Sequence, residues 1–253
     1  MLTTFVKTEN SNRFFAGLLA LADRGASEAC FLVVDGEPGL GKTTIVYRWV
    51  VQEGCVYLRA KKEWTPGWML RELLESLKIT PEYSFEKMYR QALGALAGQA
   101  SAAERDGTTF AVVVDEADHI SRRGEILETL RDLSDMLEIP FVLVGMGRIR
   151  NNLSRFPQIL SRVAQPVEFK PCPLSDVAAL VKGLCEVPVG DDLVAFLHAV
   201  SKGFTREVKE GIAAIERFGK RNPGKTVDCA LMDGQPLLTD RATGKPILVR
   251  VAF

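Results

Sequence analysis

The sequence has no net charge: its 253 residues include 32 lysines and arginines against 32 aspartates and glutamates. A protein with this balance has no overall basic field that would attract nucleic acid or an anionic surface. Contact with nucleic acid therefore has to depend on local groups of basic residues.

Paired cysteines and long apolar runs are also missing. The 5 cysteines include no C-x-x-C pair, the spacing that would indicate a structural metal. The first seven residues lack the layout of a signal peptide, and no apolar run approaches the ~20 residues that span a membrane. We therefore expect a soluble protein of a reducing compartment, the cytoplasm, with no membrane partner.

What the sequence does contain is centred on residues 36–43, Gly-Glu-Pro-Gly-Leu-Gly-Lys-Thr. They match the phosphate-loop pattern G-x-x-x-x-G-K-[ST] at every fixed position. An apolar run at 30–34 precedes the loop as a buried strand would, and a helix-compatible stretch at 44–51 follows it. The glycines let backbone N–H groups turn inward as an anion nest beside a helix N-terminus. The alternative is a glycine-rich turn with no ligand.

The pattern gives the loop residues their expected roles. Lys42 is expected to reach the β- and γ-phosphates of ATP and to act in catalysis, and the Thr43 hydroxyl is expected to hold Mg²⁺. ATP and Mg²⁺ are thus the expected cofactors. The expected nucleotide-binding residues of the loop are Gly36, Glu37, Pro38, Gly39, Leu40, Gly41, Lys42, Thr43 and Thr44.

A second motif follows the unbroken apolar run at 110–114, which is typical of a strand buried on both faces. Asp115 and Glu116 come at its carboxyl end, where ligands bind in open α/β sheets. In a phosphate-loop enzyme Asp115 would bind Mg²⁺ and Glu116 would activate a water as general base. An apolar strand that ends in two acids by accident is the alternative.

Five expected strands alternate with helices and predict an α/β three-layer sandwich with a five-stranded parallel sheet. We expect the strands at 30–34, 56–58, 110–114, 140–144 and near 167–169. Helices are expected at 12–24, 44–51, 67–77, 85–100, 124–137 and 148–161, with a surface connection at 100–108.

The pattern becomes all-helical after Pro171 and Pro173, which predicts a small C-terminal helical lid. We expect helices at 175–184 with Ser175 as N-cap, at 191–202 with Gly203 in the C′ position, and at 205–218. The C-terminal tail, residues 220–253, is expected to form a hairpin or a flexible arm. The expected division is 1–28, a linker and helix; 29–171, the nucleotide-binding core; 172–219, the lid; and 220–253, the tail.

These features together resemble an AAA+ ATPase, and more narrowly the B transposition protein of phage Mu and its transposon-borne relatives. The resemblance covers residues 5–218. It rests on Phe5-Val6-x-Thr8, the loop at 36–43, Asp-Glu-Ala-Asp-His at 115–119, Glu128-x-Leu130-Arg131 and Ser161-Arg162-Val163.

The resemblance implies an ATPase that binds duplex DNA with little sequence preference, assembles head to tail with itself as a ring or helical filament, and delivers target DNA to a transposase. It also implies weak hydrolysis, stimulated by DNA or the transposase, in the cytoplasm of a bacterial host.

The resemblance further assigns roles to two arginines. Arg162 corresponds to the arginine finger that acts on the nucleotide of a neighbouring subunit, with Arg155 as second choice. Arg206 corresponds to the lid arginine that touches the γ-phosphate. A surface arginine that caps a helix C-terminus and an exposed first-turn arginine are the respective alternatives.

DNA contacts are expected from two basic groups in loops that can line an AAA+ channel. Arg59, Lys61 and Lys62 form the first group, braced by Trp64, and Arg122 and Arg123 form the second. Lysine and arginine there would pair with phosphates without reading sequence. The alternative for each group is a solvated charge run.

Two departures from the Mu protein stand out. The sequence has no helix-turn-helix module ahead of the ATPase, and Gly145-Met146-Gly147 offers no polar sensor side chain after strand four. The missing sensor argues against fast hydrolysis. It favours a second function, a nucleotide-switched recruitment scaffold that scarcely hydrolyses ATP. A loader of a replicative helicase is a third option, whereas a small-molecule kinase suits the motifs less well.

Overall fold

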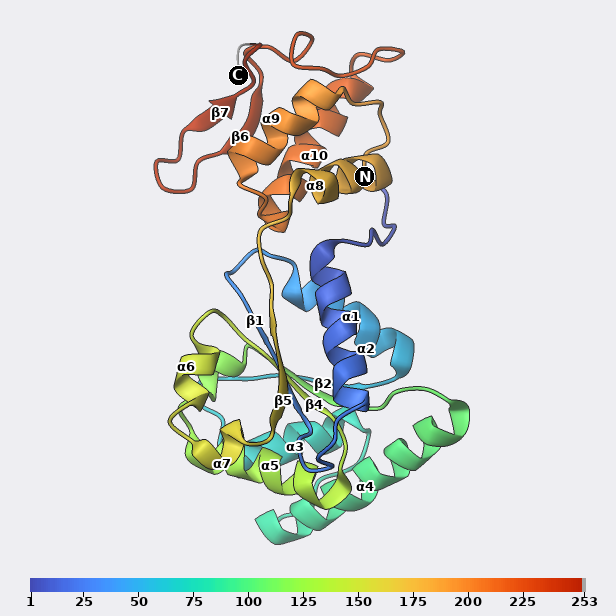
Figure 1. Ribbon diagram of the computed structural model, residues 1–253, viewed down its shortest axis with the longest axis vertical. Helices are drawn as coiled ribbons and strands as arrows, with labels where there is room; N and C mark the ends of the chain where they lie inside the picture. The colour runs from blue at the N-terminus through green and yellow to red at the C-terminus, as the bar shows by residue number, and fades with distance from the viewer. Residues whose placement is uncertain (252–253) are drawn as a thin grey trace. The chain divides into compact units, whose positions relative to one another are not determined.

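The computed structural model describes residues 1–251, and Figure 1 labels its helices and strands. The chain divides into two compact units. The sheet unit comprises Arg13–Glu37 and Lys42–Phe169. The helical unit comprises Met1–Asn12, Pro38–Gly41 and Lys170–Phe253, of which residues 252 and 253, the end of the predicted tail, lie outside the described residues.

A five-stranded parallel sheet forms the centre of the sheet unit, in the order β2-β3-β4-β1-β5. The predicted fold class is therefore confirmed. The strands are β1 (Phe31–Asp35), β2 (Val56–Arg59), β3 (Val112–Asp115), β4 (Phe141–Val144) and β5 (Val163–Glu168). Because they run parallel, the residues that follow each strand meet at one edge of the sheet, and Arg59 of β2 lies opposite Asp115 of β3.

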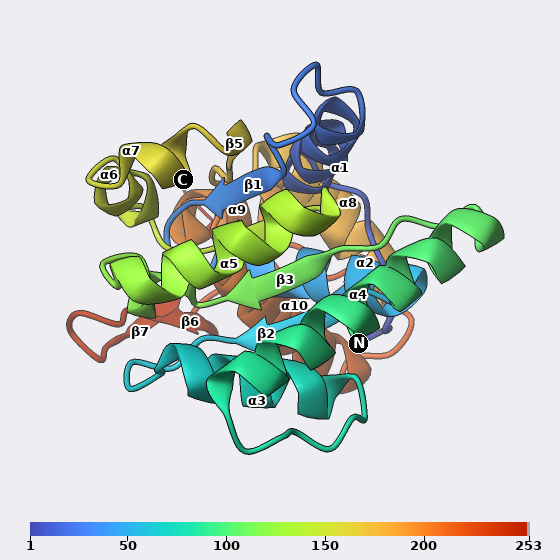
Figure 2. The ribbon, with the colours of Figure 1, turned by 90° about the horizontal axis from the view of Figure 1, so that it is seen from below.

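Helices cover both faces of this sheet, which explains why β1, β3 and β4 are apolar without alternation. One face packs against α3 (Pro66–Ser76), α4 (Phe85–Asp106) and α5 (Gly124–Leu137) in a continuous apolar core. Figure 2 views the sheet unit from the side of α4 and α5. On the other face α1 (Glu9–Ala22) and α2 (Lys42–Glu53) meet where the ring of Phe14 packs edge-on against Trp49, with 5.5 Å between the ring centroids.

Two predicted helices differ from those observed. The predicted helix at 148–161 is two short helices, α6 (Ile149–Leu153) and α7 (Pro157–Leu160), because Pro157 lacks an N–H and disfavours helical geometry at the residue before it. The predicted surface connection at 100–108 is wrong, because α4 continues to Asp106. Alanine, glutamate and arginine favour helix there, and Gly107 ends the helix at φ 67°.

The helical unit contains α8 (Leu174–Leu184), α9 (Asp191–Ser201) and α10 (Thr205–Lys220). Gly203 follows the end of α9 with φ 73°, as the sequence predicts. Ser175 is not an N-cap, because α8 begins at Leu174 and Pro173 caps it with extended backbone.

The tail forms a hairpin rather than a free arm. Strands β6 (Pro236–Thr239) and β7 (Pro246–Leu248) pair antiparallel. Leu237, Leu238 and Val249 are buried in the core of the helical unit, so the hairpin is an integral part of that unit. Across residues 1–251, no helix combines the length and the apolar character needed to cross a membrane.

Candidate active site

The predicted phosphate loop joins β1 to the first residue of α2. All three of its glycines have positive φ angles, 147° at Gly36, 93° at Gly39 and 86° at Gly41. Residues with a Cβ rarely adopt these conformations, so the glycines allow the turn that the loop makes. The loop therefore has the backbone of an anion-binding turn at a helix N-terminus.

Lys42 bends back over its own loop. Its ammonium donates to the carbonyl oxygens of Gly36 at 2.6 Å and Glu37 at 2.9 Å, and the residue is 9% exposed. A phosphate group would offer this cation an anionic acceptor, and charge-assisted hydrogen bonds of that kind are roughly twice as strong as neutral ones.

The tip of the loop lies in the helical unit, beside the start of α10. The backbone N–H of Arg206 donates to the carbonyl of Gly39 at 2.9 Å, and the Thr205 hydroxyl donates to that of Leu40 at 3.2 Å. The exposed guanidinium of Arg206 has no ion-pair partner in residues 1–251. Arg206 is thus next to the phosphate loop, and its role as γ-phosphate sensor stays a prediction.

Thr43 and Asp115 come together as the metal prediction requires. The Thr43 hydroxyl donates to Oδ2 of Asp115 at 2.8 Å, and Asp115 is 5% exposed. Mg²⁺ prefers hard oxygen ligands and commonly takes only one or two from protein, with phosphates and waters completing the set. A hydroxyl and a carboxylate at this separation, beside a phosphate loop, fit that ion.

Tyr57, which the sequence motifs did not indicate, also contacts Asp115. Its hydroxyl donates to the same Oδ2 of Asp115 at 2.7 Å. Burial raises the pKa of the Tyr57 phenol, and the Asp115 carboxylate raises it further, so the hydroxyl stays protonated and donates. The signal in the sequence was its place two residues before Arg59 on β2, the strand beside the one that ends in Asp115.

Glu116 adopts a left-handed backbone, with φ 53° and ψ 35°. Its carboxylate forms an ion pair with the guanidinium of Arg59, and His119 Nε2 lies 3.6 Å from the other carboxylate oxygen. The hydrogen bond from Arg59 lowers the pKa of Glu116 against the opposing effect of burial. The carboxylate is therefore ionised near neutral pH, as a general base must be.

The two predicted basic groups meet in the sheet unit. Arg123 Nη1 donates to the backbone carbonyl of Lys62 at 3.4 Å. Lys61 pairs with Glu72 and lies 5.2 Å from the centroid of the Trp68 ring. We call Arg59, Lys61, Lys62 and Arg123 the basic loops.

The other two residues of this prediction have different surroundings. Arg122 donates instead to the side chain of Asn152 on α6, at 3.2 Å. Trp64 is fully buried, and its indole N–H has no hydrogen-bond partner within residues 1–251. Its role as a brace for the first basic loop stays a prediction.

Comparison with known proteins places this site in a family. A family model described as an AAA domain matches residues 24–153, just over half of the chain, including the phosphate loop and both acids. The chain belongs to the AAA domain family. No curated protein sequence matches it.

Solved structures share the fold of this AAA domain at low sequence identity. An Orc1 protein of Aeropyrum pernix, solved in complex with DNA, is 16% identical with a TM-score of 0.60; the match covers 89% of this chain and 63% of that one. Cdc6p of Pyrobaculum aerophilum is 18% identical with a TM-score of 0.63, over 91% and 68%. A Thermotoga maritima RuvB variant is 18% identical with a TM-score of 0.57, over 90% and 68%. The chain thus spans less than two thirds of the Orc1 chain.

The turn after β4, where AAA+ proteins usually carry a polar sensor residue, lies beside the carboxylate of Asp118. The backbone N–H of Met146 donates to Oδ2 of Asp118, and a Cβ added at Gly145 would lie 2.8 Å from that oxygen. Burial raises the pKa of Asp118, whereas the hydrogen bond from the Met146 N–H and, to a smaller extent, the charge of Lys42 oppose the rise. A side chain at position 145 would therefore have to displace the side chains of Asp118 and Ile149.

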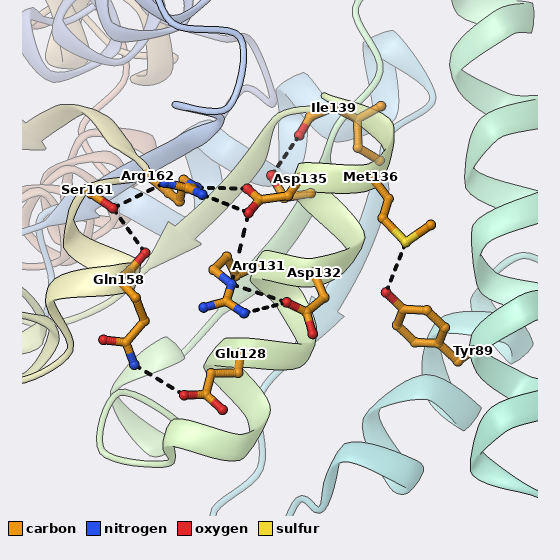
Figure 3. Close-up of polar contacts among 11 residues, drawn as sticks. Tyr89, Glu128, Arg131, Asp132, Asp135, Met136, Ile139, Gln158, Ser161 and Arg162 are labelled. Atoms are coloured by element: carbon orange, nitrogen blue, oxygen red, sulfur yellow. Dashed lines mark hydrogen bonds and ion pairs between the residues drawn. The ribbon is translucent and has the colours of Figure 1, made fainter.

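Figure 3 shows the surroundings of Arg162, the predicted finger of the AAA domain. Its guanidinium binds Asp135 of α5 through two hydrogen bonds, Nε to Oδ1 at 2.9 Å and Nη2 to Oδ2 at 3.0 Å. To act on the nucleotide of a neighbouring subunit, Arg162 would have to break its hydrogen bonds with Asp135. Arg155, the second choice, has no side-chain ion pair within residues 1–251. The assignment of the finger stays a prediction.

Proposed function

We propose that this AAA domain is a DNA-dependent ATPase, in which contact of duplex DNA with the basic loops controls the water-activating carboxylate. The observation that carries the proposal is the ion pair between Arg59 and Glu116. Arg59 belongs to the basic loops, together with the exposed Lys61 and Lys62, and Glu116 is the acid that follows β3. A ligand that binds Arg59 would therefore change the environment of the Glu116 carboxylate directly.

The nucleotide would be held by residues already close together. Lys42 would exchange its two carbonyl acceptors for phosphate oxygens, and Thr43 and Asp115 would hold the metal. Mg²⁺ supplies charge neutralisation on the phosphates when bound. Glu116 would accept a hydrogen bond, and then a proton, from the attacking water.

DNA would act on this base through Arg59. The Arg59 side chain is 68% exposed, so a DNA phosphate can reach it, and a phosphate competes with Glu116 for the same guanidinium. Release of Glu116 restores its pKa towards the ordinary value and makes it a stronger base. The similar fold of the Orc1 protein solved with DNA supports a nucleic acid as the ligand.

The finer function we propose is the delivery of target DNA to a transposase, as in the family of the phage Mu B protein. The AAA domain family supports head-to-tail self-association, in which Arg162 or Arg155 would act on the neighbour's nucleotide. Repetition of weak DNA contacts along such an assembly would raise affinity without sequence readout. The proposal of a transposase as the partner rests on the sequence resemblance alone.

Steady-state ATP turnover, with and without duplex DNA, tests the proposal. We expect DNA to raise the turnover of the parent protein severalfold, and Lys42→Ala to abolish turnover in both conditions. Turnover that DNA leaves unchanged would contradict control of Glu116 through the basic loops. Unimpaired turnover by Lys42→Ala would contradict the nucleotide site itself.

A second candidate, a recruitment scaffold that binds ATP but scarcely hydrolyses it, is favoured by one observation. The Asp118 carboxylate lies beside Gly145, where a polar sensor would stand, and a carboxylate is a poor ligand for a γ-phosphate. ATP binding without turnover, in the presence of DNA and a cognate transposase, would favour the scaffold. Copurification with a replicative helicase would favour a loader.

A further inference from the structure

Strand β2 provides a side chain to each of the two acids that end β3. Tyr57 and Arg59 are two residues apart and so lie on the same face of the sheet. Tyr57 donates to Asp115, and Arg59 pairs with Glu116. The edge strand therefore contacts both carboxylates, and the contact of Tyr57 has no part in the function proposed above.

The Asp115 carboxylate is held at both oxygens. Oδ2 accepts hydrogen bonds from Thr43 and Tyr57, and Oδ1 accepts one from the backbone N–H of Glu116 at 2.8 Å. Of these donors only Thr43 is itself an expected magnesium ligand. Tyr57 is thus a partner that fixes the carboxylate without occupying a ligand position.

The Tyr57 ring is itself held in place. The ring of Tyr47, on α2, packs against it edge-on, with centroids 5.2 Å apart and planes at 83°. Tyr47 is 51% exposed, and its hydroxyl has no hydrogen-bond partner in the described residues. The chain thus offers two neighbouring tyrosines, of which only one bonds to Asp115.

We propose that Tyr57 is a positioning residue for Mg²⁺, whose hydroxyl holds the Asp115 carboxylate in the orientation that binds the ion. The inference rests on the proposed ATP site. Groups that hydrogen-bond to a metal ligand typically contribute about 10–100-fold to metal affinity. Loss of the hydroxyl should therefore weaken Mg²⁺ binding and leave the metal-free interaction with nucleotide unchanged.

The test is a magnesium titration with a fluorescent, non-hydrolysable ATP analogue as probe. Binding of the analogue is measured in EDTA and then over rising Mg²⁺, for the parent protein, Tyr57→Phe and Tyr47→Phe. We expect the half-saturating Mg²⁺ concentration to rise about 10–100-fold in Tyr57→Phe alone. Affinity in EDTA should be the same for all three proteins.

A double-mutant cycle separates positioning from a general structural effect. In an Asp115→Asn background, Tyr57→Phe should cause no further change in the Mg²⁺ requirement, because the group on which it acts has lost its charge. A Tyr57→Phe titration within twofold of the parent would overturn the inference, as would an equal loss of affinity in EDTA. Failure of the parent to bind the analogue at any Mg²⁺ concentration would instead overturn the proposed ATP site, and the role of Tyr57 with it.

Discussion

The guanidinium of Arg59 and the carboxylate of Glu116 form an ion pair at the carboxyl edge of the sheet. The two residues come from neighbouring parallel strands, and the register places Arg59 opposite Asp115, one residue before Glu116. An exposed cation thus restrains the group expected to activate water.

Substitution Arg59→Ala should raise ATP turnover without DNA. The variant removes the hydrogen bond that lowers the pKa of Glu116, and a base with a pKa nearer the working pH is more effective. We expect turnover to rise about two- to tenfold and DNA to have little further effect, as measured by phosphate release. The control is Arg90→Ala, which breaks an exposed ion pair with Glu86 on α4. Lower turnover in Arg59→Ala, with DNA stimulation intact, would contradict the account.

Substitution Glu116→Gln should separate binding from hydrolysis. Glutamine keeps the size of the side chain but accepts no proton, so turnover should fall about 10²–10⁴-fold while ATP and DNA still bind. Single-turnover hydrolysis and equilibrium binding measure the two effects. Parent-like turnover would show that Glu116 is not the base.

Mixing experiments test the finger in trans. Arg162→Ala subunits retain a complete phosphate loop, and Lys42→Ala subunits retain the arginine, so a mixture should regain part of the ATPase that each lacks. No recovery, in mixtures shown to co-assemble, would argue against Arg162. The same experiment with Arg155→Ala tests the second choice.

Asp135→Asn provides a further check on this assignment. It weakens the two hydrogen bonds that hold the Arg162 guanidinium against Asp135 within its own subunit. A finger that must leave Asp135 should work at least as well in this variant. A purely structural pair would show lower stability and no gain in turnover.

The loss of stability on substitution of Trp64 should depend on how much of the side chain is removed. Trp64→Ala empties a fully buried site and should cost about 3–5 kcal/mol in the free energy of unfolding. Trp64→Phe keeps most of the ring and removes a buried N–H that has no partner among the described residues, so its cost should be less than half of that. Urea unfolding measures both, with Trp68→Phe, at a half-exposed site, as control. Equal losses in the two Trp64 variants would contradict this reading.

Stability at acid pH should depend on Glu216. The residue is 6% exposed. Its carboxylate accepts hydrogen bonds from Lys220 at 2.9 Å and the backbone N–H of Glu186 at 3.2 Å, and it also pairs with the amino group of Met1. Burial acts to raise its pKa, but these partners outweigh burial and lower it from 4.5 to about 2. Because the folded-state value is depressed, the contribution is present above pH 4.5 and is lost as pH falls towards 2.

Because Lys220 is 52% exposed and water screens the pair, the contribution to the free energy of unfolding should be smaller than the roughly 3 kcal/mol that the shift would give at about 1.4 kcal/mol per pH unit. Glu216→Gln should remove this part of the pH dependence between pH 4.5 and 2, as measured by thermal unfolding. Glu210→Gln, at an exposed position of the same helix, is the control. A pH profile of Glu216→Gln parallel to that of the parent would contradict the assignment.

The fold was predictable because the sequence patterns that indicate it each lie within a short stretch of the chain. Unbroken apolar strands, the phosphate loop and Asp115-Glu116 each occupy a continuous stretch, and strand order follows from the fold that they indicate. The error at 148–161 had a visible cause in Pro157, which apolar periodicity alone does not take into account. The error at the end of α4 came from reading small and polar residues as a loop, although Gly107 was the stronger stop signal.

The fine geometry of the site was not predictable, because it depends on the register between strands. Arg59 was expected to face DNA, and only its position opposite Asp115 shows that it also pairs with Glu116. Tyr57 reads in sequence as an ordinary strand residue. Asp118 was visible within the motif, but its proximity to Gly145 needs two strands to be placed side by side.

The most direct test of the account is duplex-DNA binding by fluorescence anisotropy with ATP, ADP or no nucleotide, over a series of salt concentrations. We expect binding that needs ATP, weakens steeply as salt rises, and is lost in Lys42→Ala, because the proposed DNA contacts are ion pairs with phosphates in an assembly that ATP supports. Absence of binding in every nucleotide state, or binding that ignores the nucleotide, would contradict it.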